Sequence, residues 1–372
     1  MNTEENQFEE LQQESDDLYI HQRIVVDPKQ EPLRIDKFLM DRMQRVSRNK
    51  VQEALRQGAI LVNDGPVKPN HKVKGGQVIT LVLPSPPRED SLILAENIPL
   101  DIKYEDEHLL VINKPAGLVV HPGVGNRTGT LVNSLAWHLS SDKEALEKDP
   151  YVESPGLVHR IDKNTSGIMV VPKTDLAATH LAKQFFHHTI DRAYLALVWG
   201  EPNPHKDTIE GNLGRHPKNR LLMTVFPEGE EGKEAITHYE VVEPMYYVSL
   251  VRCTLETGRT HQIRVHMKYR GHTVFSDERY GGSEILKGTV FSKYKQFVQN
   301  CFKLIPRQAL HAFSLGFEHP ATGERVYFEQ PLPEDFEAVL AKWRAYLSSR
   351  KEKLEDDDEV QQTLADLDGR LD

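Results

Sequence analysis

Apolar positions near the N-terminus predict a small module over residues 31–84. Residues 33–39 place apolar side chains every three to four positions, which is typical of a helix with one buried face. A second helix is expected to begin near Ser47, because a serine hydroxyl caps a helix N-terminus well. Residues 60–65 predict a strand that enters an Asp-Gly turn, and the alternation over residues 77–83 predicts a closing strand.

A larger domain is predicted over residues 91–348, after a proline-rich linker at residues 84–88. Its helical patterns are few and lie at residues 176–188, 260–270 and 333–348. Its strand patterns lie at residues 108–113, 118–122, 189–199, 236–243, 246–255, 309–317 and 324–329. Because many strands accompany few helices, the pattern predicts an α+β fold with a mixed, largely antiparallel sheet.

Charge is distributed unevenly along the chain, whose net charge is −10. Residues 1–20 hold seven acidic residues and no Lys or Arg, and residues 351–372 hold nine acidic and three basic residues. We expect acidic disordered tails over residues 1–30 and 349–372, because such segments bury too little apolar surface to fold. The body between them is mildly basic.

The first module carries a local excess of positive charge, with ten Lys or Arg and five Asp or Glu over residues 31–84. Such an excess favours contact with the phosphate backbone of a nucleic acid. The alternative is a solvated helical face. The candidate RNA-contacting residues of this module are Arg42, Arg45, Arg48, Lys50 and Arg56.

Several classes of protein are disfavoured by what the sequence lacks. No apolar run approaches the roughly 18 residues of a membrane-spanning helix, and the N-terminus lacks the pattern of a secretory signal. Two cysteines cannot build a disulfide framework, so a cytoplasmic, reducing compartment is expected. No Cys/His cluster has zinc-ligand spacing, and the glycines of residues 123–129 do not match the dinucleotide fingerprint.

The segment over residues 156–173 places a polar loop between two apolar runs, as is common where a rigid scaffold presents reactive groups. Asp162 is the only carboxylate of this segment and is enclosed by His159, Arg160 and Lys163. Neighbouring cations favour an ionised carboxylate, which can act as a nucleophile or a base. The alternative is that Asp162 caps a turn with its side chain.

A second candidate segment is the predicted helix over residues 260–270. Thr260 is expected to cap it, which places Gln262, Arg264 and His266 in its first turns. The basic groups can pair with a carboxylate from elsewhere or contact phosphates. The alternative is an amphipathic helix whose apolar side faces the core.

Tyr194 interrupts an otherwise apolar strand over residues 191–198. A tyrosine ring at this position can offer a platform on which a nucleobase stacks. The alternative is a core tyrosine whose hydroxyl is hydrogen-bonded. The pattern alone leaves both interpretations open.

The loop over residues 159–167 resembles the active-site signature of the RluA-type pseudouridine synthases, with Ile161 where the signature usually has leucine. The first module resembles the alpha-L RNA-binding module of the ribosomal protein S-four type. Within the family, the chain is most similar to the RluD-like subgroup, which modifies large-subunit ribosomal RNA. Further segments similar to the family occur in order at residues 114–123, 214–217, 257–266 and 307–311.

The resemblance implies a role for each candidate residue. Asp162 matches the catalytic aspartate, Tyr194 the tyrosine that stacks on the target uracil, and Arg264 the arginine that pairs with the catalytic carboxylate. Arg160 matches the arginine that helps to displace the target base and fills its place, and His159 beside it is expected to contact RNA.

The reaction implied by the resemblance is the isomerisation of uridine to pseudouridine within RNA. Uracil leaves its ribose carbon, rotates and rejoins through carbon 5, so no cofactor, metal or energy source is required. Asp162 either attacks as a nucleophile or removes the C2′ proton of the ribose, and the sequence leaves this choice open.

The expected partner is RNA, with large-subunit ribosomal RNA as the leading substrate. Neither a small-molecule cofactor nor a membrane partner is expected, and a monomer is expected because nothing in the sequence requires a symmetric partner. One alternative is the same reaction on transfer RNA. Another is a noncatalytic RNA-binding protein of ribosome assembly, against which the presence of Asp162, Tyr194 and Arg264 together argues.

Overall fold

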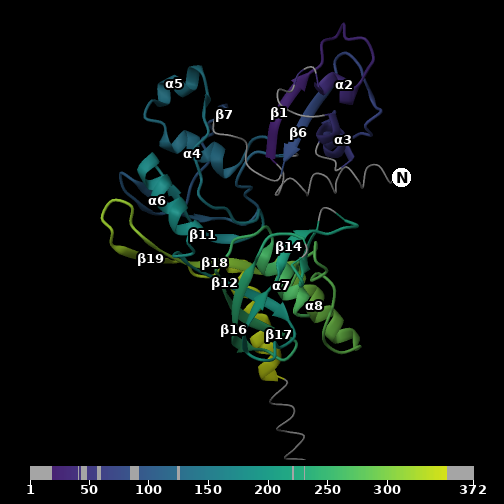
Figure 1. The fold of residues 1–372 in the computed structure, drawn as a ribbon. Coiled ribbons are helices and arrows are strands. Elements are labelled where there is room, and N and C mark those ends of the chain that lie inside the picture. The colour runs from purple at the N-terminus through teal and green to yellow at the C-terminus, as the bar shows by residue number, and fades with distance from the viewer. Residues whose placement is uncertain are drawn as a thin grey trace, which may run out of the picture. The chain divides into compact units, whose positions relative to one another are not determined.

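The computed structural model describes most of the chain and divides it into two compact units (Figure 1). The residues that it describes are 19–40, 42, 48–56, 60–83, 92–123, 126–219, 222–229 and 231–349. The first unit comprises Met1–Asp101, Gly117–Lys163 and Val171–Lys173, and the second comprises Ile102–Ala116, Asn164–Val170 and Thr174–Asp372. The domain predicted over residues 91–348 therefore contributes segments to both units.

The first unit begins with a module of short strands and short helices. Its described elements are β1 (Tyr19–Val25), β2 (Leu33–Arg34), α2 (Ile35–Met40), α3 (Arg48–Arg56), β3 (Ile60–Val62), β4 (Gly65–Pro66), β5 (Lys72–Val73) and β6 (Val78–Leu83). One sheet has the order β1-β6-β3-β4, and β2 pairs with β5. The two predicted helices and the predicted closing strand are present, and apolar side chains of both helices pack with those of β3 and β6 in one core.

Strand β1 lies inside the stretch that we expected to be an acidic tail. It pairs antiparallel with β6, from Tyr19 opposite Leu83 to Val25 opposite Val78. The expectation of a disordered tail is wrong for residues 19–25. The acidic run ends before this strand, and its β-branched residues favour an extended chain.

The turn between β3 and β4 has the positive φ angles that a two-residue hairpin loop requires. They occur at Asn63 (φ 50°) and Asp64 (φ 64°), and Val62 pairs with Gly65 across the turn. Asn and Asp tolerate this left-handed conformation better than bulkier residues do. The predicted tight turn is therefore present, centred one residue earlier than the Asp-Gly pair.

The rest of the first unit contains a small strand pair and two helices. Strand β7 (Leu92–Leu94) pairs antiparallel with β10 (Tyr151–Glu153), and the helices are α4 (Leu131–Leu139) and α5 (Lys143–Lys148). Thr130 and the third residue of α4 cap one another in a reciprocal box, which explains why this helix begins there.

The strand predicted over residues 118–122 does not form in this part of the described chain. The carbonyl groups of Val119 and Val120 instead accept hydrogen bonds from the backbone N–H groups of Leu131 and Val132. These are N–H groups of the first turn of α4, which have no partner within the helix. The carbonyl groups of this apolar run therefore accept hydrogen bonds from the first turn of α4 and not from a neighbouring strand.

The second unit is built on a mixed sheet. Its described strands are β8 (Ile102–Glu105), β9 (Leu109–Lys114), β11 (Ser166–Pro172), β12 (Asp191–Trp199), β13 (Lys206–Glu210), β16 (Ile236–Pro244), β17 (Val248–Leu255), β18 (Leu310–Glu318) and β19 (Arg325–Glu329). The order is β13-β16-β17-β12-β18-β11-β9-β8, and β19 pairs with β18 outside this path. β12 runs antiparallel to β17 and β18, whereas β11 runs parallel to β18. The predicted α+β fold with a mixed, largely antiparallel sheet is confirmed.

Helices and a hairpin accompany this sheet. They are α6 (Asp175–Phe186), α7 (Gln262–Tyr269), α8 (Ser292–Leu304), a C-terminal helix over residues 334–349, and the hairpin of β14 (Asn212–Arg215) with β15 (Met223–Phe226). Helix α7 packs against β15 and β16. The predictions of α6, α7 and the C-terminal helix are correct to within a few residues, whereas the sequence analysis missed α8 and the hairpin.

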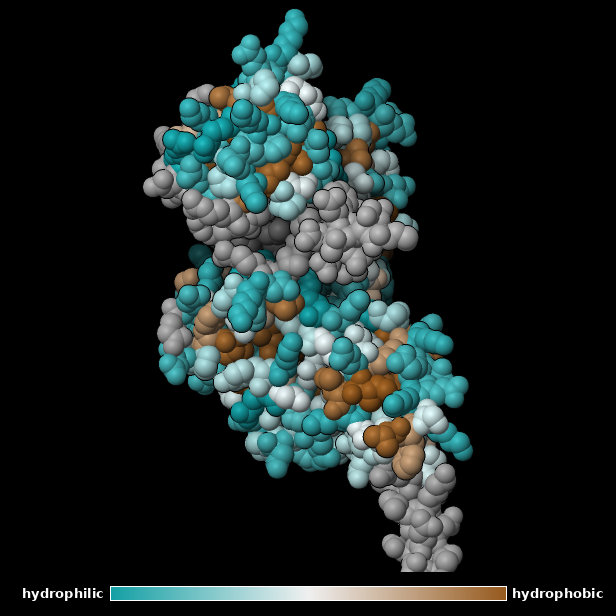
Figure 2. Space-filling model, turned by 90° about the vertical axis from the view of Figure 1, so that its right-hand side faces the viewer, coloured by the Kyte–Doolittle hydropathy of each residue, from teal (hydrophilic) through white to brown (hydrophobic). Residues whose placement is uncertain are grey.

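One apolar cluster of the second unit joins β12 and β17 to α8 and the C-terminal helix. The rings of Trp199, Phe275 and Trp343 are fully buried there, with centroids 5.0–6.3 Å apart. This packing buries apolar side chains of β12, the strand that carries Tyr194. The face drawn in Figure 2 is mainly hydrophilic, with several separate hydrophobic areas. None of the helices in the described ranges has the length and apolar character needed to cross a membrane.

Candidate active site

Asp162 lies in a loop between β10 and β11 that has no regular secondary structure. Its neighbour Ile161 is 5% exposed, whereas Asp162 itself and the cations Arg160 and Lys163 are half-buried. The backbone N–H of Gly117 donates to the carbonyl of Lys163 at 2.9 Å and so holds the end of this loop segment. The structure thus presents the carboxylate on a loop anchored by a buried aliphatic residue.

Tyr194 lies on the central strand β12 and is 9% exposed. It is opposite Cys253 on β17 and Ala312 on β18, and the register with β18 shifts between Ala193 and Tyr194. Such a bulge changes the direction in which a side chain leaves the strand. Most of the ring is buried, so any stacking surface is confined to the small part that solvent reaches.

Arg192, two residues before Tyr194, ties this strand to the turn that leads into α7. Its side chain is buried, Nη2 donates to the carbonyl of Glu256 at 3.1 Å, and its guanidinium lies 5.3 Å from the ring centroid of Phe185. A Cβ added to Gly258 would lie 2.8 Å from Arg192 Nη1, so a larger residue there would displace the end of the arginine side chain. Sequence reasoning missed Arg192, although a cation in a buried strand was a visible anomaly.

Arg264 on α7 forms a buried ion pair with Asp277. Its Nε is 2.7 Å from Oδ2 and its Nη2 is 2.9 Å from Oδ1, and the two side chains are 6% and 1% exposed. The guanidinium carbon lies 5.0 Å from the ring centroid of Tyr280, whose backbone N–H donates to Asp277 at 3.2 Å. A carboxylate partner for Arg264 was expected from the sequence, but nothing in the local pattern pointed to Asp277.

The N-terminus of α7 differs from the expectation of a Thr260 cap. His261 is the N-cap residue, with φ 55°, and its side chain makes no capping hydrogen bond. Its Nδ1 lies 2.7 Å from the hydroxyl of Tyr280, which accepts a hydrogen bond from the backbone N–H of Met223. A tyrosine hydroxyl has one proton and two lone pairs, so it can accept from Met223 and also donate to, or accept from, His261 Nδ1 according to the tautomer of that ring.

Gln262 and His266 are structural residues in this arrangement. Gln262 accepts from Thr257 Oγ1 and the backbone N–H of Arg259, and it donates to Ile236 O and Thr237 Oγ1, at 2.8–3.0 Å. His266 is fully buried, and burial lowers its pKa to about 4. It is therefore neutral near pH 7, which removes it from the cations that can contact phosphate.

The predicted RNA-contacting residues of the first module are only partly described. Arg42 is exposed, and its guanidinium lies 3.8 Å from the ring centroid of Phe38. Arg48 is half-exposed, and its Nε and Nη2 donate to Asp36 Oδ2 at 3.2 and 2.9 Å. Outside the described residues lie Arg45 and the side chains of Lys50 and Arg56.

Asp36 is a buried carboxylate at the start of α2 that the sequence analysis regarded only as a helix starter. It also accepts from Arg34 at 2.9 and 3.1 Å and from Gln52 at 2.8 Å. Hydrogen bonds, chiefly from Arg34, hold the pKa of this carboxyl well below its usual range and outweigh the opposing effect of burial. Arg48 therefore stabilises the module through Asp36, whatever further contact it makes.

The predicted residues divide between the two units. His159, Arg160 and Asp162 belong to the first unit, and Tyr194 and Arg264 belong to the second. Within the second unit, Arg192 links the strand of Tyr194 to the turn before α7. Across the described ranges, no group of three or more His, Cys, Asp or Glu side chains is arranged to hold a metal ion.

Comparison with known proteins matches both parts of the chain. The family model described as RNA pseudouridylate synthase matches residues 108–269, and the S4 domain model matches residues 33–79. A protein of Chlorobaculum parvum named as an uncharacterized RNA pseudouridine synthase is 47% identical over 321 residues, which cover 86% of this chain and 97% of that protein. The ribosomal large subunit pseudouridine synthase D of Zymomonas mobilis is 40% identical over 310 residues, which cover 82% and 92%.

A solved structure is also similar to this chain. Human RNA pseudouridylate synthase domain containing 4 has a TM-score of 0.50 at 25% identity, with coverage of 65% of this chain and 92% of that chain. The chain belongs to the RluA-type family of RNA pseudouridine synthases. It is therefore an isomerase that acts on uridine in RNA, and its first module is an S4 domain, as the sequence predicted.

Proposed function

We propose that this enzyme converts uridines of large-subunit ribosomal RNA to pseudouridine. The observation that carries the proposal is the 40% identity, over most of both chains, to a protein named ribosomal large subunit pseudouridine synthase D. The basic first module supports it, because it supplies affinity for a phosphate backbone. We also propose that the enzyme is cytoplasmic and acts as a monomer.

Asp162 is the proposed catalytic carboxylate. Its half-buried position on an anchored loop gives it access to a substrate while limiting its motion. The reaction needs one ionised carboxylate, either to attack the ribose or uracil ring or to remove the C2′ proton of the ribose. Both routes use the same oxygen atoms, so both are compatible with this position.

Tyr194 is the proposed stacking residue for the extruded uracil. Extrusion of a base costs a few kcal/mol, and stacking on an aromatic ring returns about 1–3 kcal/mol. A ring that the sheet holds rigidly loses little entropy when the base binds. The burial of most of Tyr194 supports a fixed platform rather than a mobile one.

Arg264 is the proposed partner of the catalytic carboxylate. A guanidinium has five N–H donors, and the ion pair with Asp277 uses two of them. Asp277 fixes the plane of the guanidinium and offsets part of its buried charge. Arg160 and His159 are the proposed contacts that occupy the space of the displaced base and hold the neighbouring RNA.

The test is tritium release from RNA that carries uracil labelled at carbon 5. Large-subunit ribosomal RNA, large-subunit particles and transfer RNA are supplied separately to the wild type and to Asp162→Asn, which keeps the side-chain volume but lacks the charge. We expect release from ribosomal RNA or its particle, loss of release with Asp162→Asn, and RNA binding within about twofold of wild type.

The outcomes separate the parts of the proposal. Release from transfer RNA alone contradicts the proposed substrate but leaves the chemistry. Full activity of Asp162→Asn contradicts the proposed role of that carboxylate. If none of the three substrates releases tritium, the proposed substrate class is contradicted.

A further inference from the structure

Arg307 is a buried arginine that lies between α8 and β18, outside the residues to which the proposed function gives a role. Its side chain is 7% exposed. Its Nε is 2.6 Å from Asp335 Oδ2 and its Nη2 is 2.9 Å from Asp335 Oδ1, which is a two-point ion pair. Such a pair fixes the plane of the guanidinium and directs its remaining N–H groups.

The other edge of Arg307 contacts the chain just after Asp162. Its Nη1 donates to the carbonyl of Asn164 at 3.0 Å and, at longer distances, to the carbonyls of Gln308 and Leu310. Asn164 is two residues after Asp162, so the two Cα atoms are no more than about 7.6 Å apart along the chain. The guanidinium therefore holds the backbone close to the proposed catalytic carboxylate.

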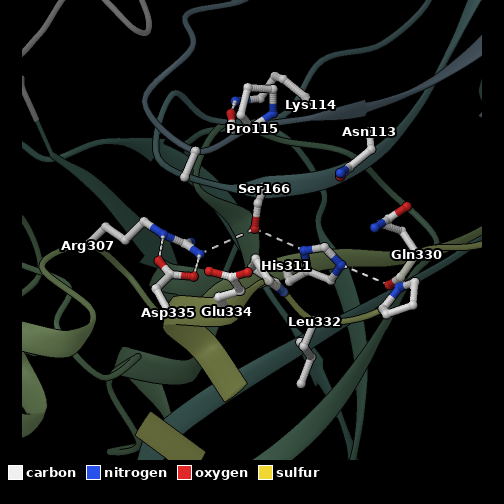
Figure 3. Close-up of a pocket in the computed structure, with 13 residues that line it drawn as sticks. Asn113, Lys114, Pro115, Ser166, Arg307, His311, Gln330, Leu332, Glu334 and Asp335 are labelled. Carbon is white, nitrogen blue, oxygen red and sulfur yellow. Dashed lines mark hydrogen bonds and ion pairs between the residues drawn. The ribbon is translucent and has the colours of Figure 1, made fainter. Parts of the chain in front are cut away.

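A directed chain of hydrogen bonds continues from Arg307 through the start of β11 (Figure 3). Ser166 Oγ lies 3.4 Å from Arg307 Nη2 and 2.9 Å from His311 Nδ1, and His311 Nε2 lies 2.9 Å from the carbonyl of Gln330. The carbonyl of Gln330 can only accept, so the proton of neutral His311 is on Nε2. Ser166 then donates to Nδ1 and accepts from Arg307, and every bond of the chain has one direction.

This network lies where the loop of Asp162 enters the sheet. Ser166, the first residue of β11, is opposite His311 on β18 in the parallel pairing of these strands. Ser166, Arg307, His311 and Asp335 also line a cavity of about 420 Å³ (Figure 3). Burial lowers the pKa of His311, which agrees with the neutral ring that the hydrogen bonds require. A protonated ring could not accept from Ser166.

We infer that Arg307, oriented by Asp335, is a positioning residue that fixes the carbonyl of Asn164 and the start of β11 and thereby holds Asp162 in place for the reaction. This inference rests on the proposed role of Asp162. A lysine cannot replace Arg307, because one ammonium group cannot bind both oxygens of Asp335 and also reach Asn164 and Ser166 in their fixed directions.

The experiment compares Arg307→Lys with Arg344→Lys in the full chain. Arg344 also forms a two-point pair with a carboxylate, Glu243, but it is 44% exposed and lies on the C-terminal helix. Each variant keeps the positive charge but removes the two-point pairing of a guanidinium with its carboxylate. The two variants therefore form a matched pair. The single-turnover rate of tritium release, the Kd for the same RNA and thermal unfolding are measured for each variant and for Asp162→Asn.

We expect Arg307→Lys to lower the single-turnover rate by about 10- to 100-fold, because small displacements of a reacting group have effects of this size. The Kd for RNA stays within about twofold of wild type, because Arg307 itself does not contact the substrate in this account. Arg344→Lys changes neither quantity by more than about twofold. If Arg307→Lys does not fold, Asp335→Asn tests the inference, with an expected rate loss of about 3- to 10-fold at unchanged Kd.

A rate within twofold of wild type for the folded Arg307 variant, or for Asp335→Asn in its place, overturns the inference. Rate and RNA affinity that fall together, in proportion to the loss of folded protein, also overturn it, because they indicate a purely structural role. An inactive Asp162→Asn beside a fully active Arg307→Lys leaves the proposed function intact and removes only the inference. A fully active Asp162→Asn contradicts the proposed function as well.

Discussion

Two buried carboxylates, one in each unit, bind arginine in different ways. In the S4 domain, Asp36 has no exposed surface, but its partners Arg34 and Arg48 are 41% and 50% exposed. In the second unit, Arg264 and Asp277 are both buried. The first arrangement fixes the inner ends of arginines whose remaining surface faces solvent. The second removes both charges from water. In such a buried pair, only good geometry offsets the loss of hydration.

The difference fits the proposed roles of the two clusters, RNA binding for the first and catalysis for the second. An arginine that is half in water can exchange or add a phosphate contact at little cost. A fully buried arginine is preorganised, so it presents its charge in one orientation at every encounter. The following predictions test this comparison, beginning with the largest expected effect.

Asp277→Asn is expected to lower the free energy of unfolding of the second unit by about 3–5 kcal/mol, because it leaves the Arg264 charge buried without its carboxylate. Urea unfolding followed by tryptophan fluorescence measures the change. Asp207→Asn is the control, since its pair with Arg270 is exposed and should contribute less than about 1 kcal/mol. Equal losses for the two variants would contradict the distinction between buried and exposed pairs.

Asp36→Asn is expected to destabilise the S4 domain by about 2–3 kcal/mol, because an amide accepts weaker hydrogen bonds from Arg34 and Arg48. Hydrogen exchange of the backbone amides of α2 and α3 in the full chain measures the change. The pKa of Asp36 is lowered in the folded state, so its contribution is complete above about pH 4 and is lost as pH falls further.

The wild type and the Asp36 variant should therefore converge in stability at strongly acidic pH. Glu31→Gln is the control, because Glu31 is an exposed carboxylate of the same module. A difference between wild type and Asp36→Asn that stays constant from pH 7 to pH 2 would contradict the assigned cause.

Asp106→Asn extends the comparison to a second kind of carboxylate. The hydrogen bonds that lower the pKa of Asp106 come from groups other than arginine. Burial raises the pKa of Asp106, but hydrogen bonds from the backbones of Leu109 and His108 and from Tyr104 and His319 bring it to about 2. His319 Nδ1 accepts from two backbone N–H groups, so Nε2 carries its proton and donates to Asp106.

We expect Asp106→Asn to reduce stability by about 2 kcal/mol at pH 7, since the folded pKa is about two units below that of an unfolded aspartate. This stabilisation is present above about pH 4 and is lost as pH falls toward 2. Urea unfolding at pH 7 and pH 3 measures the loss of stability in the variant and its decrease at acidic pH. The neighbouring exposed Glu107→Gln should change stability by less than about 0.5 kcal/mol at either pH.

Arg42→Gln is expected to have the smallest effect on folding and to act on RNA binding instead. Arg42 is exposed, so the free energy of unfolding should change by less than about 0.5 kcal/mol. Loss of one phosphate contact should reduce the slope of log affinity against log salt by about one. RNA binding at several salt concentrations measures this slope, with Arg344→Gln as the control. An unchanged slope would exclude Arg42 from the RNA contacts.

Local patterns predicted much of the second unit. Apolar spacing located α6, β12, β16, β17, β18 and the C-terminal helix, because each has one face that must be buried. Helix α8 was missed although its buried Tyr294, Val298 and Cys301 have helical spacing. The strand predicted over residues 118–122 failed because an apolar run shows that a segment is buried but not which backbone groups it will satisfy.

Asp162 among cations, Tyr194 in an apolar strand and the cluster around Arg264 stand out as local patterns in the sequence, but these patterns left a structural alternative open for each residue, and the predicted roles came from the resemblance to the family. The sequence did not identify the partners of the buried arginines. Asp277 is 13 residues from Arg264, and Asn164 is 143 residues from Arg307. Such pairs depend on how strands and turns bring distant segments together, and hydrogen-bond direction exists only once that arrangement is formed. Residue type and spacing determine which groups are present, whereas the tertiary fold decides which charges are buried, which are held in one orientation, and which remain in water.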